Sequence, residues 1–136
     1  MGNITHHVNT DKSLKTLKRG VHASDVDQLL SSAGPFTMFA PSDLAFEKLQ
    51  KGLIDELLEP QNRLKLAQLV KNHIIKGSIR LKDLKDGDTL TTISGKELTV
   101  QVKNGNVSID NAEIQPLHAE ANNGIVHFVD NVLLNK

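Results

Sequence analysis

The stretch TMFAPSDLAF, residues 37–46, is the most informative part of the sequence about the fold, because it joins an apolar run to the start of a helix. Residues 36–40 are apolar and bounded by two prolines, which is typical of a short strand buried in the core. Ser42 can then cap a helix through its side-chain oxygen. Asp43 follows in the first turn, where the helix dipole favours negative charge. A buried strand that runs straight into a short helix is therefore predicted.

Helical patterns occupy most of the first half of the chain. Apolar residues at spacings of three and four predict an amphipathic helix over residues 14–21. Residues 24–27 have the form of a capping box and predict the start of a second helix. A short helix is expected over residues 53–58. Pro60 pre-sets the first turn of the longest helix, which extends to about Ile75.

The second half of the chain changes to the period of a strand. A strand is predicted over residues 90–93, and residues 98–103 alternate apolar and polar side chains as a half-buried strand does. Asn104-Gly105 predicts a two-residue hairpin turn with a positive φ at the glycine. Residues 125–129 are apolar on both faces, which predicts a central strand. Helices followed by hairpin-connected strands indicate an α+β fold with a mostly antiparallel sheet.

Composition excludes several classes of function. The 136 residues carry 16 Lys+Arg and 16 Asp+Glu, so charge does not favour binding to nucleic acid or to an anionic membrane. Four Phe, no Tyr and no Trp leave little for stacking on single-stranded nucleic acid. The absence of cysteine excludes disulfides, thiolate metal sites and cysteine nucleophiles. No apolar run has the length of a membrane span. The length fits one domain, residues 1–136, with a core of about 3–134.

The familiar catalytic motifs are absent from this sequence. No G-x-S-x-G, S-x-x-K, H-E-x-x-H or G-x-G-x-x-G pattern occurs, so we expect no catalytic residue and no cofactor. No two histidines have the i, i+4 spacing of a helical metal pair, so we expect no metal. His6 and His7 are interpreted as part of a frayed terminus. A loose basic stretch that includes Arg80 and Lys82 is interpreted as a solvated face, with contact to an acidic polysaccharide as the alternative.

Two histidines lie within apolar segments. His73 falls on the inner side of the predicted long helix, and His127 falls in the predicted central strand. Either can be a buried acid, base or ligand, but we favour core residues whose ring nitrogens are hydrogen-bonded. The expected partners are Asp43 or Ser42 for His73, and a backbone carbonyl for His127.

Three segments in the same order resemble the signatures of the fasciclin domain. Residues 37–46 resemble its first signature, T-x-F-A-P-[ST]-x-x-A-F. Residues 123–134, NGIVHFVDNVLL, resemble its second, N-G-x-[IV]-H-x-[IV]-D-x-V-L. Between them, residues 72–77, NHIIKG, are similar to the family's Y-H-x-x-x-G segment. The resemblance covers roughly residues 3–134.

The resemblance implies a twisted β-wedge with helices packed along it. It also implies a non-enzymatic adhesion module that binds a cell-surface or matrix protein or a glycan. The chain is similar to small bacterial members, which are secreted or lipid-anchored, so a secreted, periplasmic or surface-anchored monomer is expected. Residues 1–20 show no signal-peptide pattern. The family motifs point to five candidate binding residues, which we expect to be mainly structural: His73, Asn72, Asp43, His127 and Asp130.

Two departures from the family pattern argue against integrin binding. The tyrosine that usually precedes the central histidine is Asn72 here. The Asp-Ile pair of some animal members corresponds to His118 and Ala119, and an imidazole cannot supply the carboxylate that an integrin metal requires. Two other functions stay open. One is a carrier of a small apolar ligand such as a carotenoid or lipid, and the other is a hydrolase.

Overall fold

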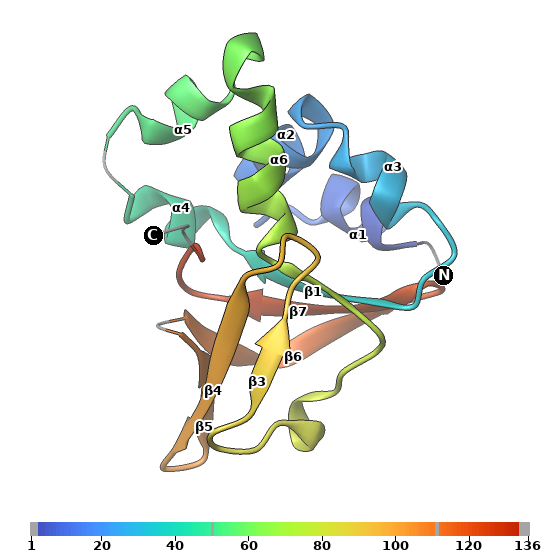
Figure 1. The fold of residues 1–136 in the computed structure, drawn as a ribbon, viewed down its shortest axis with the longest axis vertical. Coiled ribbons are helices and arrows are strands. Elements are labelled where there is room, and N and C mark those ends of the chain that lie inside the picture. The colour runs from blue at the N-terminus through green and yellow to red at the C-terminus, as the bar shows by residue number, and fades with distance from the viewer. Residues whose placement is uncertain (1–2, 50, 111, 134–136) are drawn as a thin grey trace.

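The computed structural model describes residues 3–49, 51–110 and 112–133. The helices are α1 (Ile4–Thr10), α2 (Lys15–Ala23), α3 (Val26–Leu30), α4 (Asp43–Glu47), α5 (Leu53–Leu57) and α6 (Arg63–Lys71), with 3-10 turns η1 (Pro60–Asn62) and η2 (Leu81–Asp83). The strands are β1 (Phe36–Pro41), β2 (Ile74–Lys76), β3 (Thr89–Thr91), β4 (Glu97–Lys103), β5 (Asn106–Ile109), β6 (Ala112–Ala121) and β7 (Gly124–Val129). Figure 1 shows the helices gathered on one side of the sheet, with β1 and β7 beneath them.

The described strands form one seven-stranded sheet in the order β2-β1-β7-β6-β5-β4-β3. Neighbours run antiparallel except β1 and β7, which are parallel. The main-chain N–H of Ile93, just after β3, donates to the carbonyl of Ile74 in β2 at 2.9 Å. This bond ties the two ends of the sheet together, so the sheet curls into a nearly closed wedge. The predicted α+β class is therefore confirmed.

The strands at the centre of the sheet separate two apolar cores. In β1, Met38 and Ala40 pack into the core beneath the helices, whereas Phe39 points into the core inside the wedge. In β7, Val126 joins the first core and Val129 the second. Alternate side chains of a strand point to opposite faces, so a strand covered on both faces is largely apolar. The prediction of a central last strand is confirmed, since β7 lies between β1 and β6.

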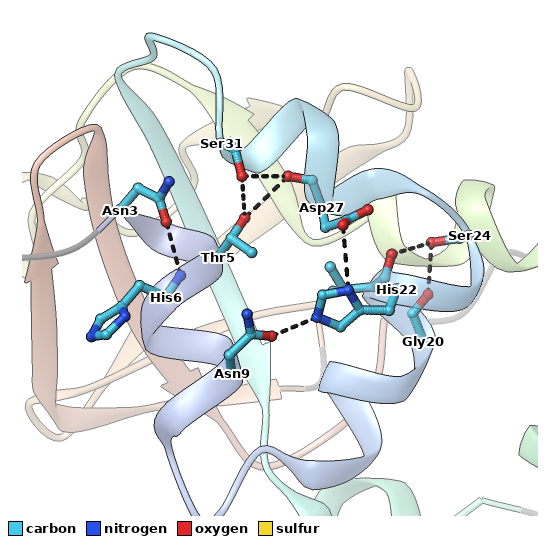
Figure 2. Close-up of polar contacts among 10 residues, drawn as sticks. Asn3, Thr5, His6, Asn9, Gly20, His22, Ser24, Asp27 and Ser31 are labelled. Carbon is cyan, nitrogen blue, oxygen red and sulfur yellow. Dashed lines mark hydrogen bonds and ion pairs between the residues drawn. The ribbon is translucent and has the colours of Figure 1, made fainter.

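The first three helices are tied together by polar contacts (Figure 2). The Thr5 and Ser31 hydroxyls both donate to the main-chain carbonyl of Asp27, at 3.1 and 2.8 Å. The His22 ring lies between the Asn9 side-chain oxygen, at 2.5 Å, and the Asp27 carboxylate, at 3.3 Å. These contacts hold α1, α2 and α3 as one layer over the sheet.

The prediction of a frayed N-terminus at His6 and His7 is wrong. Both residues lie in α1, whose Ile4 and Val8 are fully buried in the core beneath the helices. The Ile4 N–H also donates to the side-chain oxygen of Asn123 at 2.9 Å. Two apolar residues four apart thus dock this helix on the sheet.

Several local signals correspond to the observed structure. The Ser42 side chain accepts a hydrogen bond from the Ala45 N–H at the start of α4, as predicted. Asn104 and Gly105 have φ values of 54° and 81° in the turn between β4 and β5, which confirms the hairpin. A Cβ on Gly124 would lie 1.9 Å from the Phe36 carbonyl oxygen, so β1 approaches β7 closely at that glycine.

Two predictions of helix boundaries are wrong. Ser24 does not cap α3, because its hydroxyl donates back to the Gly20 carbonyl at 2.7 Å and so closes α2. The long helix predicted to about Ile75 ends at Lys71 in α6, and β2 begins at Ile74. Ile74 packs into the core beneath the helices and Ile75 into the core inside the wedge. Adjacent side chains that point to opposite sides require a strand rather than a helix.

Candidate interaction site

His73 and Asn72 fasten the C-terminal segment to the end of α6. The Leu133 N–H donates to His73 Nε2 at 2.9 Å, and the Asn72 amide donates to the Leu133 carbonyl at 3.2 Å. His73 Nδ1 lies 2.9 Å from the Leu69 carbonyl. The expected partners Asp43 and Ser42 are therefore wrong for His73. The helix ends before residue 73, so the ring faces the C-terminal segment rather than α4.

The hydrogen bonds of His73 define its protonation state. Nε2 accepts from a main-chain N–H, so Nδ1 carries the proton and donates to the Leu69 carbonyl. Burial of the ring lowers the pKa of His73 from 6.5 to about 4, although hydrogen bonds to the Leu69 and Val70 main chain act in the other direction. The imidazole is consequently neutral at physiological pH and uses both nitrogens within the fold.

Asn72 adds a third segment to this junction. Its side-chain oxygen accepts a hydrogen bond from the Ser94 hydroxyl at 2.5 Å, in the turn between β3 and β4. Asn72 is fully buried. The amide therefore joins the turn, the C-terminal segment and α6, a role that needs both a donor and an acceptor.

Asp43 and Asp130 accept hydrogen bonds from main-chain N–H groups. Asp43 Oδ1 accepts from the Thr16 N–H at 2.8 Å, which satisfies one open donor in the first turn of α2. Asp130 Oδ1 accepts from the Glu113 N–H at 2.7 Å and so fixes the start of β6 against the end of β7. Within the described residues, no group of three or more His, Asp or Glu side chains is placed to hold a metal ion.

His127 differs from His73 in having one nitrogen without a partner. Its Nε2 lies 2.7 Å from the Ile79 carbonyl, the kind of partner that the sequence predicts, so Nε2 carries the proton. Its buried Nδ1 has no hydrogen-bond partner among the described residues. The ring stacks on Phe39, with centroids 5.7 Å apart, and lies 5.8 Å from the His118 ring. Burial lowers the pKa of His127 as well.

The five sequence candidates do not form one site. Asn72 and His73 act together, Asp43 and Asp130 lie where β1 and β7 end, and His127 faces the segment after β2. Each makes at least one hydrogen bond to the main chain.

An accessible cleft lies elsewhere, at the mouth of the wedge. It has a volume of about 650 Å³ and is lined by Arg80, Leu81, Lys82, Gly105, Val107 and His118. These residues come from the segment after β2, the β4–β5 hairpin and β6. Sequence reasoning placed Arg80 and Lys82 in a basic stretch but missed the cleft, because the hairpin and β6 reach it only through the curl of the sheet. Lys82 and His118 are exposed.

An ion pair stands beside this cleft. Arg80 donates to the Glu120 carboxylate at 2.8 Å, and each group is about half exposed. The Arg80 guanidinium lowers the pKa of the Glu120 carboxyl through this hydrogen bond and its charge. A second hollow of about 380 Å³ adjoins the same pair and includes Ser78, Asn122 and Asn123. Arg80 lines both hollows.

The apolar space beneath the helices is much smaller. A cavity of about 10 Å³ lies between α2, α4, α5 and α6, lined mainly by apolar side chains that include Leu17, Phe46 and Val70. That volume is close to the minimum for a single water molecule. In this conformation the cavity has no room for a carotenoid or an acyl chain.

Comparison with known proteins places the chain among fasciclin-domain proteins. The family model described as Fasciclin domain matches residues 12–135. Protein sll1483 of Synechocystis sp. is 35% identical over 91% of this chain and 68% of its own length. The uncharacterized protein sll1735 of the same organism is 36% identical over 98% of both chains.

Animal proteins also match, but the chain spans only part of them. Transforming growth factor-beta-induced protein ig-h3 of Sus scrofa is 30% identical over 97% of this chain and 19% of its own length. A solved FAS1 domain pair from the insect cell adhesion molecule fasciclin I superposes with a TM-score of 0.84 at 18% identity. That match covers 98% of this chain and 51% of the other. With a matching family model over most of its length, this chain belongs to the fasciclin-domain family.

Proposed function

We propose that the chain is a single-domain, non-enzymatic adhesion module that binds a protein on a cell surface or in a matrix. It acts as a monomer that is secreted, periplasmic or anchored at the surface. The adhesion proteins among its relatives support this kind of role. The cleft at Arg80, Lys82 and His118 is the observation that carries the proposal, because it offers exposed polar and apolar groups together.

Its side chains favour a protein over a neutral glycan as partner. Neutral sugars are held largely by aromatic rings that stack on their apolar faces. Phe36 and Phe39 are buried, and Phe46 and Phe128 are half-buried against the core. A peptide surface instead needs hydrogen-bonding groups and small apolar contacts, which the cleft supplies.

Catalysis finds little support in the geometry. His73 spends both nitrogens on main-chain groups, and His127 is buried against Phe39. The exposed pair of His22 and Asp27 resembles a base with its orienting carboxylate, but the other ring nitrogen meets the Asn9 amide rather than a nucleophile.

No helix among the described residues is long and apolar enough to cross a membrane.

Beads coated with the full chain test the proposal on cells of the source organism. We expect the beads to adhere more than albumin-coated beads. Trypsin treatment of the cells should abolish adhesion, and periodate treatment, which oxidises glycans, should leave it intact. Adhesion equal to that of albumin-coated beads would contradict the adhesion function. Loss of adhesion after periodate treatment alone would contradict a protein as the partner. Saturable turnover in an ester and glycoside screen would overturn the non-enzymatic assignment.

A further inference from the structure

The β6 strand is paired on one side for most of its length and on the other side only at its start. It pairs with β7 from Ile114 to Ala121, with a register shift in between. Its pairing with β5 is confined to Ala112 and Glu113. In the described part of the chain, no strand pairs with that second side of β6 beyond Glu113.

The register shows which main-chain groups lie on this open edge. The Ser42 N–H donates to the Val129 carbonyl, so odd-numbered residues of β7 direct their main-chain groups toward β1 and even-numbered ones toward β6. Ala119 and Ala121 are opposite Val126 and Gly124, and they therefore exchange hydrogen bonds with β7. The residues that alternate with them, His118 and Glu120, direct their N–H and C=O groups away from β7.

The open edge borders the cleft described above. His118 lines the cleft on the β6 side, and Gly105 and Val107 form the facing wall. The volume of about 650 Å³ is within the range of about 300–1,000 Å³ that ligand sites occupy. The gap between β5 and β6 therefore offers main-chain hydrogen-bonding groups together with room for an added segment.

We propose that this edge, residues 118–121, accepts an extended acidic segment of the partner protein as an added strand. The proposal rests on the adhesion function and names how the partner docks. In such pairing, main-chain hydrogen bonds provide affinity, and side-chain contacts provide specificity. The charged side chains that line the cleft are Arg80 and Lys82, and no described acidic residue lines it.

Neighbouring charges determine how the segment is held. Glu120 pairs with Arg80, and Asp83 accepts the Arg80 main-chain N–H. Lys82 forms no ion pair with another described residue, so it is the first cation available to an incoming carboxylate. A second carboxylate competes with Glu120 for Arg80. Walls on both sides favour a single peptide strand over the sheet edge of a second copy, which carries its own neighbouring strands.

A peptide titration on the isotopically labelled full chain tests this docking mode. The probe is acetyl-Thr-Val-Glu-Val-Asp-Val-Thr-amide, followed through the backbone amide NMR signals of the protein. We expect saturable shifts at residues 118–121 and slower hydrogen exchange at the His118 and Glu120 amides. Two matched peptides serve as controls, one with lysines in place of the acidic residues and one N-methylated on alternate amides. Equal binding of either control, or shifts confined to other regions, would overturn the proposal.

Paired substitutions separate the main chain from the side chains. His118→Pro and His118→Val both remove the imidazole, but only proline removes the N–H on the open edge. We expect about tenfold weaker peptide binding for His118→Pro than for His118→Val, since main-chain pairing supplies the affinity. Should His118→Pro fail to fold, the N-methylated peptide still decides the question.

Charge substitutions provide a second pair. Lys82→Glu should weaken binding about fivefold, whereas Lys65→Glu on the exposed face of α6 should not change it. Glu120→Gln should strengthen binding about twofold to fivefold because it releases Arg80. Unchanged affinity in Lys82→Glu, or weaker binding in Glu120→Gln, would contradict the assignment.

Other results separate this docking mode from the adhesion function. The NMR signals of residues 118–121 could shift with protein concentration when no peptide is present. That result would identify a second copy of the chain as the occupant and contradict an acidic peptide segment in that place. Cell adhesion that persists in His118→Pro would overturn the docking mode and leave the adhesion function standing. Peptide binding without any cell adhesion would overturn the adhesion function alone.

Discussion

His73 and His127 are equally buried, each 1% exposed, yet their surroundings give them different roles. His73 donates to one main-chain group, accepts from another and holds Leu133 against α6. His127 makes one hydrogen bond, to Ile79, and contacts the exposed ring of His118. The burial of a histidine therefore does not indicate its role, which depends on how many ring nitrogens the fold uses. The His73 region fastens the chain, whereas the His127 region lies behind an accessible cleft.

Removal of the His73 ring should produce the largest effect. His73→Ala leaves the Leu69 carbonyl and the Leu133 N–H without partners and opens a cavity, so we expect a loss of about 3–5 kcal/mol in unfolding free energy. Urea denaturation measures this loss, with His6→Ala at an exposed position of α1 as the control. A change in unfolding free energy below about 0.5 kcal/mol would show that His73 does not fasten the C-terminal segment to the fold.

Acid should destabilise the wild-type protein through the same ring. The unfolded chain binds a proton at His73 near pH 6.5 and the folded chain only near pH 4, so this contribution to stability is complete above 6.5. It is lost as the pH falls from about 6.5 to about 4, by about 3 kcal/mol. Unfolding free energies of wild type and His73→Ala across this range should converge at low pH. Parallel curves would show that His73 does not titrate as described.

His127→Ala should cost less than His73→Ala. The substitution leaves only the Ile79 carbonyl without its hydrogen-bond partner, because Nδ1 of His127 has no partner in the part of the chain that the structure describes. We therefore expect the lost hydrogen bond to lower the unfolding free energy by about 1–3 kcal/mol. The same denaturation series compares the two variants directly. If His127→Ala proves the more destabilising, the contrast between the two regions fails.

The smallest effect on stability is expected at the cleft. Arg80→Gln removes an exposed ion pair with Glu120, and such pairs contribute little to folding. Its thermal midpoint should match that of the wild type, while adhesion to cells should fall. A marked drop in the thermal midpoint would show that Arg80 stabilises the fold, and it would contradict the contrast between the His73 region and the cleft.

The sequence predicted the features that depend on nearby residues. The buried strand before Ser42, its cap and the hairpin at Asn104-Gly105 follow from local backbone preferences. The end of α6 was misjudged because Ile74 and Ile75 satisfy both a helical and a strand pattern, and only pairing with β1 decides between them. Partners such as Leu133 for His73 arise from contacts 60 residues apart, which no local pattern encodes.

The candidate site was predicted less completely than the fold. The five motif residues were named, but their main-chain partners lie in other segments of the chain, which only the fold brings close. The cleft needs the segment after β2, the β4–β5 hairpin and β6 to meet, and this follows from the curl of the sheet. Its only trace in the sequence was the basic stretch that holds Arg80 and Lys82.

The ring tautomers of the two histidines test the contrast most directly. Long-range proton–nitrogen NMR spectra at pH 7 distinguish a proton on Nδ1 from one on Nε2. The hydrogen bonds predict a neutral ring protonated at Nδ1 for His73 and a neutral ring protonated at Nε2 for His127. The same tautomer in both rings, or a charged His73, would contradict the account.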